Sequence, residues 1–132
     1  MKLEGRTAFV TGGDRGIGKG IALEMAKEGA DVAFSYRTNL EAAQATAAEI
    51  DRLGRRVLAV QADVTEPVQV GAAVDAALGA LGRIDILVNN AGIASKGRFI
   101  LETEPEEMLR LFHIHVMGAF YTTRALLPTL RR

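Results

Sequence analysis

The sequence predicts an α/β protein, a three-layer half-Rossmann fold in which a parallel sheet of four strands lies between helices. Short apolar runs that fit buried strands alternate along the chain with stretches whose apolar residues recur at helical spacing. Strands joined through helices need crossover connections, which make the sheet parallel and the connections right-handed. Four strands and four helices account for all 132 residues, so we expect a single domain over 1–132.

The boundaries of these elements follow from apolar runs and from the residues that interrupt them. Glycine after the last apolar turn is a common helix stop, and Gly29, Gly54 and Gly82 each follow a helical pattern. In chain order, we expect strands over 7–11, 32–36, 57–60 and 84–88, and helices over about 17–28, 40–53, 65–81 and 104–130.

Composition excludes several classes of function. Lys+Arg and Asp+Glu both number 16, so the chain has no basic field to hold a nucleic-acid backbone. Cysteine is absent, which excludes disulfides and thiolate metal ligands, and we expect no metal site. No apolar run approaches the roughly 20 residues that a membrane span needs. The N-terminus has no apolar stretch typical of a secretory signal. We therefore expect a cytoplasmic protein that binds neither nucleic acid nor membranes.

The segment TGGDRGIG, residues 11–18, lies between the first expected strand and the first expected helix. In this context a glycine-rich turn is typical of dinucleotide binding. Gly12 and Gly16 permit a tight turn and close approach of a pyrophosphate, and Gly18 permits close packing of the helix on the strand. The amides at the helix start, with their partial positive charge, favour an anion. The alternative is an ordinary glycine-rich loop.

A second phosphate-binding motif overlaps this segment. Residues 13–20 nearly match GxxxxGK[ST], but Gly20 stands where a hydroxyl should hold magnesium. The best candidate for a magnesium-binding acid, Asp85, lies near the start of its strand, whereas ligands of such sheets bind at the carboxyl ends of strands. We therefore exclude a nucleoside triphosphatase.

Two further motifs follow strands at the expected ligand-binding edge: Ala62-Asp63-Val64 and Asn89-Asn90-Ala91-Gly92. With TGGDRGIG, they make the chain resemble the N-terminal half of the short-chain dehydrogenase/reductase family, especially its 3-oxoacyl carrier-protein reductase-like members. The resemblance covers essentially all of the chain. It implies strand order 3-2-1-4 and a bound nicotinamide dinucleotide.

The resemblance also implies roles for residues that match the family's motifs. Asp63 and Val64 would contact adenine, and residues 90–92 would line the adenosine and ribose side. The alternatives are that Asp63 caps the next helix and that Asn89-Asn90 forms a turn. The full set of residues expected to bind the cofactor is Gly12, Arg15, Gly16, Ile17, Gly18, Tyr36, Arg37, Asp63, Val64, Asn90, Ala91 and Gly92.

The end of the second strand favours NADP(H) over NAD(H). Tyr36 stands where NAD-preferring members of the family have an aspartate, which would accept a hydrogen bond from the ribose 2′-OH and repel a 2′-phosphate. Arg37 follows it, and Arg15 lies inside the turn. Two guanidiniums with no facing acid favour the 2′-phosphate, because a planar fork suits phosphate oxygens. The alternative is that either arginine is an ordinary solvated charge.

The family's reaction uses an Asn, a Ser and a Tyr-x-x-x-Lys pair, whose tyrosine acts as general acid or base. His115 stands where the family has the Asn, and the 132 residues contain no Tyr-x-x-x-Lys. His115 is the candidate substitute acid because histidine titrates near neutral pH. The alternative is that His115 is only a packed helix residue.

Three interpretations remain open. The chain is a half-length NADP(H)-dependent oxidoreductase with weak activity on carbonyls or alcohols, a cofactor-binding module without catalysis, or a truncated product that folds through self-association. With no strand beyond the fourth, residues 84–88 would form an open apolar edge. We therefore expect a homodimer or higher homo-oligomer, through the fourth strands or through exchanged last helices.

Overall fold

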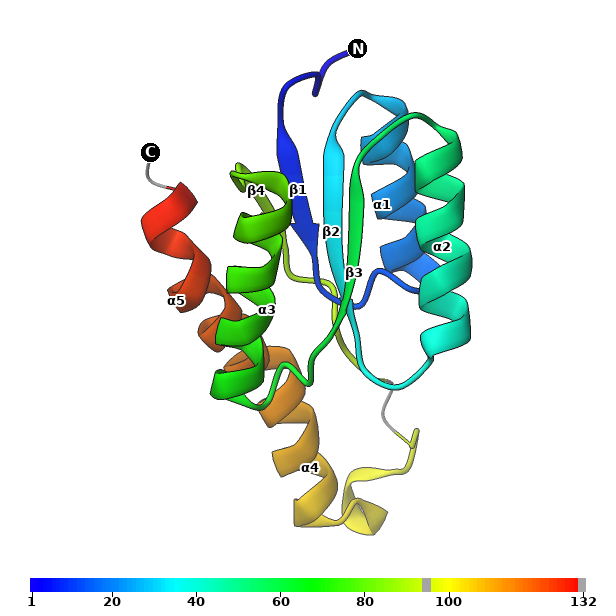
Figure 1. Ribbon diagram of the computed structural model, residues 1–132. Coiled ribbons are helices and arrows are strands. Elements are labelled where there is room, and N and C mark those ends of the chain that lie inside the picture. Colours follow the sequence, from blue (N-terminus) through cyan, green and yellow to red (C-terminus); the bar gives the residue numbers. More distant parts are fainter. Residues whose placement is uncertain (94–95, 131–132) are drawn as a thin grey trace.

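The predicted sheet is confirmed in a computed structural model of the chain, which describes residues 1–93 and 96–130. Its strands are β1 (Thr7–Val10), β2 (Asp31–Tyr36), β3 (Val57–Gln61) and β4 (Ile86–Val88). All pairings are parallel, and the strand order is β3-β2-β1-β4, as the resemblance implies (Figure 1). All four carboxyl ends therefore meet at one edge of the sheet.

Helices cover both faces of the sheet. The helices α1 (Gly16–Lys27) and α2 (Leu40–Arg52) lie on one face, and α3 (Pro67–Leu81) and α5 (Gly118–Leu130) lie on the other (Figure 1). Successive side chains of a strand point to opposite faces, so β1 supplies both cores. Phe9 packs with Val74 and Leu126 under α3 and α5, and Val10 packs with residues of α1 and α2.

The strand β4 is shorter than the predicted 84–88. Just before β4, Asp85 makes two hydrogen bonds to Thr7. Its amide donates to the Thr7 carbonyl (2.8 Å), and its Oδ2 accepts from the Thr7 amide (2.9 Å). Partial burial raises the pKa of Asp85, but the hydrogen bonds from Arg83 and Thr7 outweigh burial and hold it below the usual value. Asp85 therefore fixes the start of β4. The Asn89–Gly92 motif lies at the other end of this strand.

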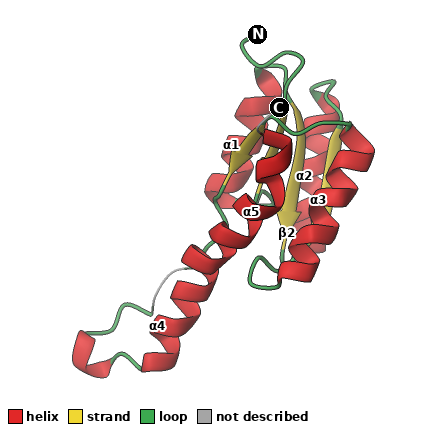
Figure 2. Ribbon diagram, turned by 90° about the vertical axis from the view of Figure 1, so that its left-hand side faces the viewer, coloured by secondary structure: helices red, strands yellow, loops and turns green. Residues whose placement is uncertain are grey.

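The last helical segment is interrupted where one continuous helix over 104–130 was predicted. It consists of α4 (Pro105–Phe112), a five-residue π-helical turn η2 (His113–Met117) and α5. A Cβ on Gly118 would lie 2.7 Å from Cγ2 of Val64, so the start of α5 approaches the loop after β3 closely. Figure 2 shows α4 projecting beyond the sheet, together with the preceding 3-10 turn η1 (Ile100–Glu102).

Several apolar residues of the helices are largely exposed. Ile17 is 78% exposed because it lies in the first turn of α1, at the strand-end edge of the sheet. Met108 and Phe112 are 59% and 51% exposed because α4 lies beyond the sheet. No helix in the described part of the chain combines the length and apolarity that crossing a bilayer requires.

Candidate functional site

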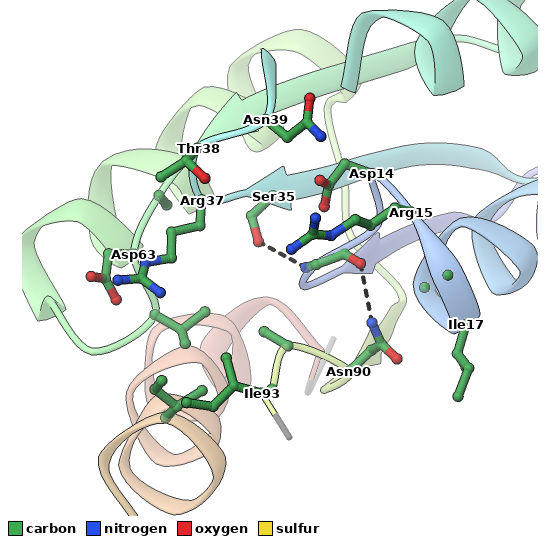
Figure 3. A pocket seen from close by; sticks show the side chains of 18 of the residues that line it. Asp14, Arg15, Ile17, Ser35, Arg37, Thr38, Asn39, Asp63, Asn90 and Ile93 are labelled. Carbon is green, nitrogen blue, oxygen red and sulfur yellow. Dashed lines mark hydrogen bonds between the residues drawn. The ribbon is translucent and has the colours of Figure 1, made fainter. Parts of the chain in front are cut away.

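A cavity of about 480 Å³ lies at the carboxyl ends of the strands (Figure 3). Its volume falls within the range of about 300–1,000 Å³ that is usual for small-molecule sites. The lining comes from the turn after β1, the ends of β2 and β3, the loop after β4 and the η2 turn. This is the edge at which open parallel sheets bind their ligands.

The structure brings the sequence-predicted site residues together at this cavity, with one exception. Tyr36 is 9% exposed and packs in the core on the side of α1 and α2, because strand alternation turns it away from the cavity. The predicted residues that line the cavity are Gly12, Arg15, Gly16, Ile17, Gly18, Arg37, Asp63, Val64, Asn90, Ala91, Gly92 and His115.

Several lining residues were not predicted from the sequence. Most of them flank predicted residues at the ends of the strands, so the strand-end rule could have identified them. The strand-end rule could not have predicted Ile114, because its position depends on the η2 turn. The additional lining residues are Asp14, Ser35, Thr38, Asn39, Ala62, Ile93 and Ile114.

The glycine-rich turn has backbone conformations and close contacts that require glycine. Gly12 and Gly16 have φ values of +67° and +59°, in the left-handed region that residues with a Cβ rarely adopt. A Cβ on Gly18 would overlap the Gly12 carbonyl oxygen and the side-chain nitrogen of Asn90. The first turn of α1 therefore packs directly on the turn that precedes it.

Hydrogen bonds join this turn to the loop after β4. Asn90 Nδ2 donates to the carbonyl oxygen of Thr11 (3.1 Å) and to that of Gly12 (3.1 Å), the second of which is drawn in Figure 3. The buried Thr11 hydroxyl accepts from the amides of Asn90 (3.0 Å) and Ala91 (2.9 Å). These four hydrogen bonds fix two loops that are nearly 80 residues apart in sequence.

A second set of hydrogen bonds fixes the other side of the turn. The Gly12 amide donates to Ser35 Oγ (3.3 Å), and the Gly13 amide donates to the Ser35 carbonyl (3.0 Å). The Thr46 hydroxyl of α2 donates to the Asp14 carbonyl (2.9 Å). The turn is thus held before any ligand binds, which lowers the entropic cost of binding.

The start of α1 is suited to an anion. Its N-cap, Arg15, makes no side-chain capping bond, and the first turn of the helix carries no acidic residue. The amides of Ile17 and Gly18 have no acceptor in the described part of the chain. Unpaired amides at a helix start, together with the helix dipole, attract phosphate groups.

The charges of the cavity differ from the sequence expectation that no acid faces the two guanidiniums. Asp14 and Asp63 line the same cavity as Arg15 and Arg37, and Figure 3 shows Arg37 beside Asp63. Partial burial raises the pKa of Asp63, but two hydrogen bonds from Thr65 and the nearby Arg37 charge lower it below the usual value. Asp63 is therefore ionised at neutral pH, and the cavity holds both signs of charge.

The imidazole of His115 is held against the loop after β4. Its Nε2 lies 2.8 Å from the Ile93 carbonyl oxygen and 3.2 Å from the Ile93 amide nitrogen. A Cβ on Gly92 would overlap the ring, so glycine is needed there for this contact. His115 therefore links the η2 turn to the cavity rim, and its Nε2 already has a backbone partner.

Comparisons with known proteins agree with this geometry. The sequence profile of the short chain dehydrogenase family matches residues 6–132. An uncharacterized oxidoreductase of Methylorubrum extorquens is 41% identical over 124 residues, which cover 94% of this chain and 50% of that protein. The chain spans about half the length of this relative and of other curated relatives that it matches.

Two solved structures contain the same fold. A short chain dehydrogenase from Burkholderia cenocepacia in complex with NADP has a TM-score of 0.92 at 42% identity, covering 98% of this chain and 53% of that one. A blue fluorescent protein from a metagenomic library, in complex with NADPH, has a TM-score of 0.91 at 40% identity with the same coverage.

Two glycines in the first turns of α1 provide a matched test of the site's packing. We expect Gly18→Ala to lower the free energy of unfolding by about 1–3 kcal/mol, because the new Cβ overlaps Gly12 and Asn90. Gly20→Ala, whose Cβ would meet open space, should raise it by about 0.5–1 kcal/mol through helix propensity. Urea denaturation measures both, and equal effects of the two substitutions would contradict the close packing.

Proposed function

The chain belongs to the short-chain dehydrogenase family, and on that premise we propose that its cavity binds NADP(H) in preference to NAD(H). The observation that carries the proposal is the fixed glycine-rich turn, whose unpaired Ile17 and Gly18 amides stand at the helix start beside Arg15. A diphosphate there accepts hydrogen bonds from the backbone without displacing a side-chain cap.

The remaining parts of the cofactor have candidate partners along the cavity. The adenine would lie near Asp63 and Val64, and the ribose side near Asn90, Ala91 and Gly92, as the family resemblance implies. Arg37, which follows β2, would hold the 2′-phosphate. The NADP and NADPH in the two similar solved structures support this choice of cofactor.

The cofactor preference is tested by reversing the charge at the end of β2. Arg37→Asp should weaken NADPH binding about 10- to 100-fold, since a charge-assisted phosphate contact is lost and a repulsion replaces it. NADH binding should stay the same or strengthen, because an acid accepts from the ribose 2′-OH. Fluorescence titration of both cofactors measures the two dissociation constants.

The matched control is Arg52→Asp, which makes the same charge change at an exposed position at the end of α2, outside the cavity. It should leave both dissociation constants within about twofold of wild type, as expected for a distant, screened charge. Unchanged NADPH affinity in Arg37→Asp would show that Arg37 does not bind the 2′-phosphate.

We further propose weak carbonyl reductase or alcohol dehydrogenase activity, with a cofactor-binding module without catalysis as the alternative. When bound, the nicotinamide supplies a hydride to a carbonyl carbon or accepts one from an alcohol. The observation in favour is that His115 lines the cavity. To protonate a developing alkoxide, its ring would have to release the Ile93 contact or donate from Nδ1.

A pair of histidines tests this role. His115→Ala should lower the rate of NADPH consumption with aldehydes by roughly 10²-fold or more, the usual effect of removing a general acid. His113→Ala, two residues away and outside the cavity lining, should leave the rate unchanged. Equal rates in the wild type and His115→Ala would remove His115 from the mechanism.

We also propose that the chain self-associates through the outer face of its last helical segment. This outer face consists of Leu109, Phe112, Val116, Phe120 and Leu127, all at least 45% exposed. Exposed apolar patches of this kind mark interaction sites. Leu126, on the core-facing side of α5, is fully buried in the core of its own chain, which favours pairing of outer faces over exchange of helices.

Light scattering at micromolar concentration tests the association. We expect a mass of at least twice the 14.1 kDa of one chain. The double substitution Phe112→Asp with Val116→Asp should give the monomer mass, because two buried charges would disfavour the interface. Val68→Asp, on the exposed side of α3, is the control and should leave the mass unchanged. A monomeric wild type would contradict the proposal.

A further inference from the structure

The register of two neighbouring strands brings Arg37 and Asp63 near each other at the cavity. The strands β2 and β3 pair Tyr36 with Gln61, and the Ala62 amide donates to the Tyr36 carbonyl (3.0 Å). Gln61 Nε2 donates to the Arg37 carbonyl (3.0 Å), which ties the residue after β2 to the end of β3. Figure 3 shows the Arg37 guanidinium turned toward the Asp63 carboxylate.

The Asp63 carboxylate is fixed by its own loop. Its Oδ1 accepts from the Thr65 amide (2.9 Å) and from the Thr65 hydroxyl (2.7 Å). Its backbone amide donates to Gln69 Oε1 (2.9 Å). Oδ2 accepts no hydrogen bond within the described residues, so one carboxylate oxygen remains available beside the cavity.

The Arg37 side chain has more freedom than its neighbour. Its backbone is anchored by Gln61, but the side chain is exposed. A long, exposed arginine side chain moves between nearby anions at little cost. Under the proposed function, two anions would lie within its reach once the cofactor is bound: the Asp63 carboxylate and the 2′-phosphate.

We propose that Asp63 is a specificity-determining residue, which limits the preference for a 2′-phosphorylated cofactor by competing with that phosphate for Arg37. The inference rests on the proposed function, because it assigns Arg37 to the 2′-phosphate. NADP(H) draws the Arg37 guanidinium away from Asp63. The attraction between the two side chains is then lost, and this loss reduces the affinity that the phosphate gains from Arg37. NAD(H) leaves the guanidinium beside Asp63, so its affinity bears no such loss.

The substitution Asp63→Asn tests the competition with little risk to the fold. The asparagine Oδ1 still accepts from Thr65, so the loop keeps its two hydrogen bonds. The ratio of the NADH dissociation constant to the NADPH dissociation constant should rise about 5- to 10-fold, as expected for removing one nearby charge in a half-exposed site. A changed adenine contact would affect both cofactors equally and cancel in the ratio.

The matched control is Glu66→Gln, which removes the same charge from the same loop but at a residue outside the cavity lining. In Glu66→Gln, the ratio of the NADH to the NADPH dissociation constant should match that of the wild type. If Asp63→Asn binds both cofactors and its ratio of dissociation constants equals that of the wild type, the competition is wrong. The proposed function would remain intact. A wild type that binds neither cofactor would overturn both.

A second background shows whether Asp63 acts through Arg37. In Arg37→Gln, we expect the further substitution Asp63→Asn to leave the ratio unchanged, because the guanidinium for which the carboxylate competes is gone. If Asp63→Asn raised the ratio equally in both backgrounds, the carboxylate would act by direct repulsion of the phosphate, and the competition would be wrong. Fluorescence titrations at one ionic strength measure all four variants of this cycle.

Discussion

The candidate site depends on the hydrogen bonds between the turn after β1 and the loop after β4. The Asn90 side chain donates to the Thr11 and Gly12 carbonyls, and the Thr11 hydroxyl accepts from the Asn90 and Ala91 amides. Because a Cβ on Gly18 would overlap both Gly12 and Asn90, these contacts also set how closely α1 approaches the turn. Partly buried hydrogen bonds that act together are costly to break, so the unpaired amides of α1 keep one position.

The sheet and most of the cavity could be predicted from the sequence because local patterns specify them. The alternation of apolar strands with helical patterns predicts a parallel sheet, and the motifs that follow the strands mark its carboxyl edge, whereas the strand order follows from the family resemblance. The exceptions depend on contacts between distant segments. The η2 turn ends where Gly118 meets Val64, and spacing along one helix does not reveal that contact. Similarly, the pairing register of β2 and β3 brings Asp63 to Arg37, although the sequence suggested no facing acid.

The proposed cofactor binding and the proposed catalysis depend on different residues of the chain. The cavity is lined by residues from the ends of all four strands, so a dinucleotide bound there would meet fixed backbone amides and both signs of charge. The chemistry has less support, because His115 already contacts the Ile93 backbone and the 132 residues contain no Tyr-x-x-x-Lys pair. The dissociation constants of NADPH and NADH, and the ratio between them, are therefore better supported by the geometry of this chain than turnover is.

Amide chemical shifts measured during an NADPH titration test most directly whether the turn binds the diphosphate. At saturation, the amide resonances of Ile17 and Gly18 should move strongly, since these unpaired groups gain phosphate acceptors. Those of Gly71 and Gly79 on α3, outside the cavity lining, should stay in place. Unmoved Ile17 and Gly18 resonances at saturating NADPH would contradict diphosphate binding at the start of α1.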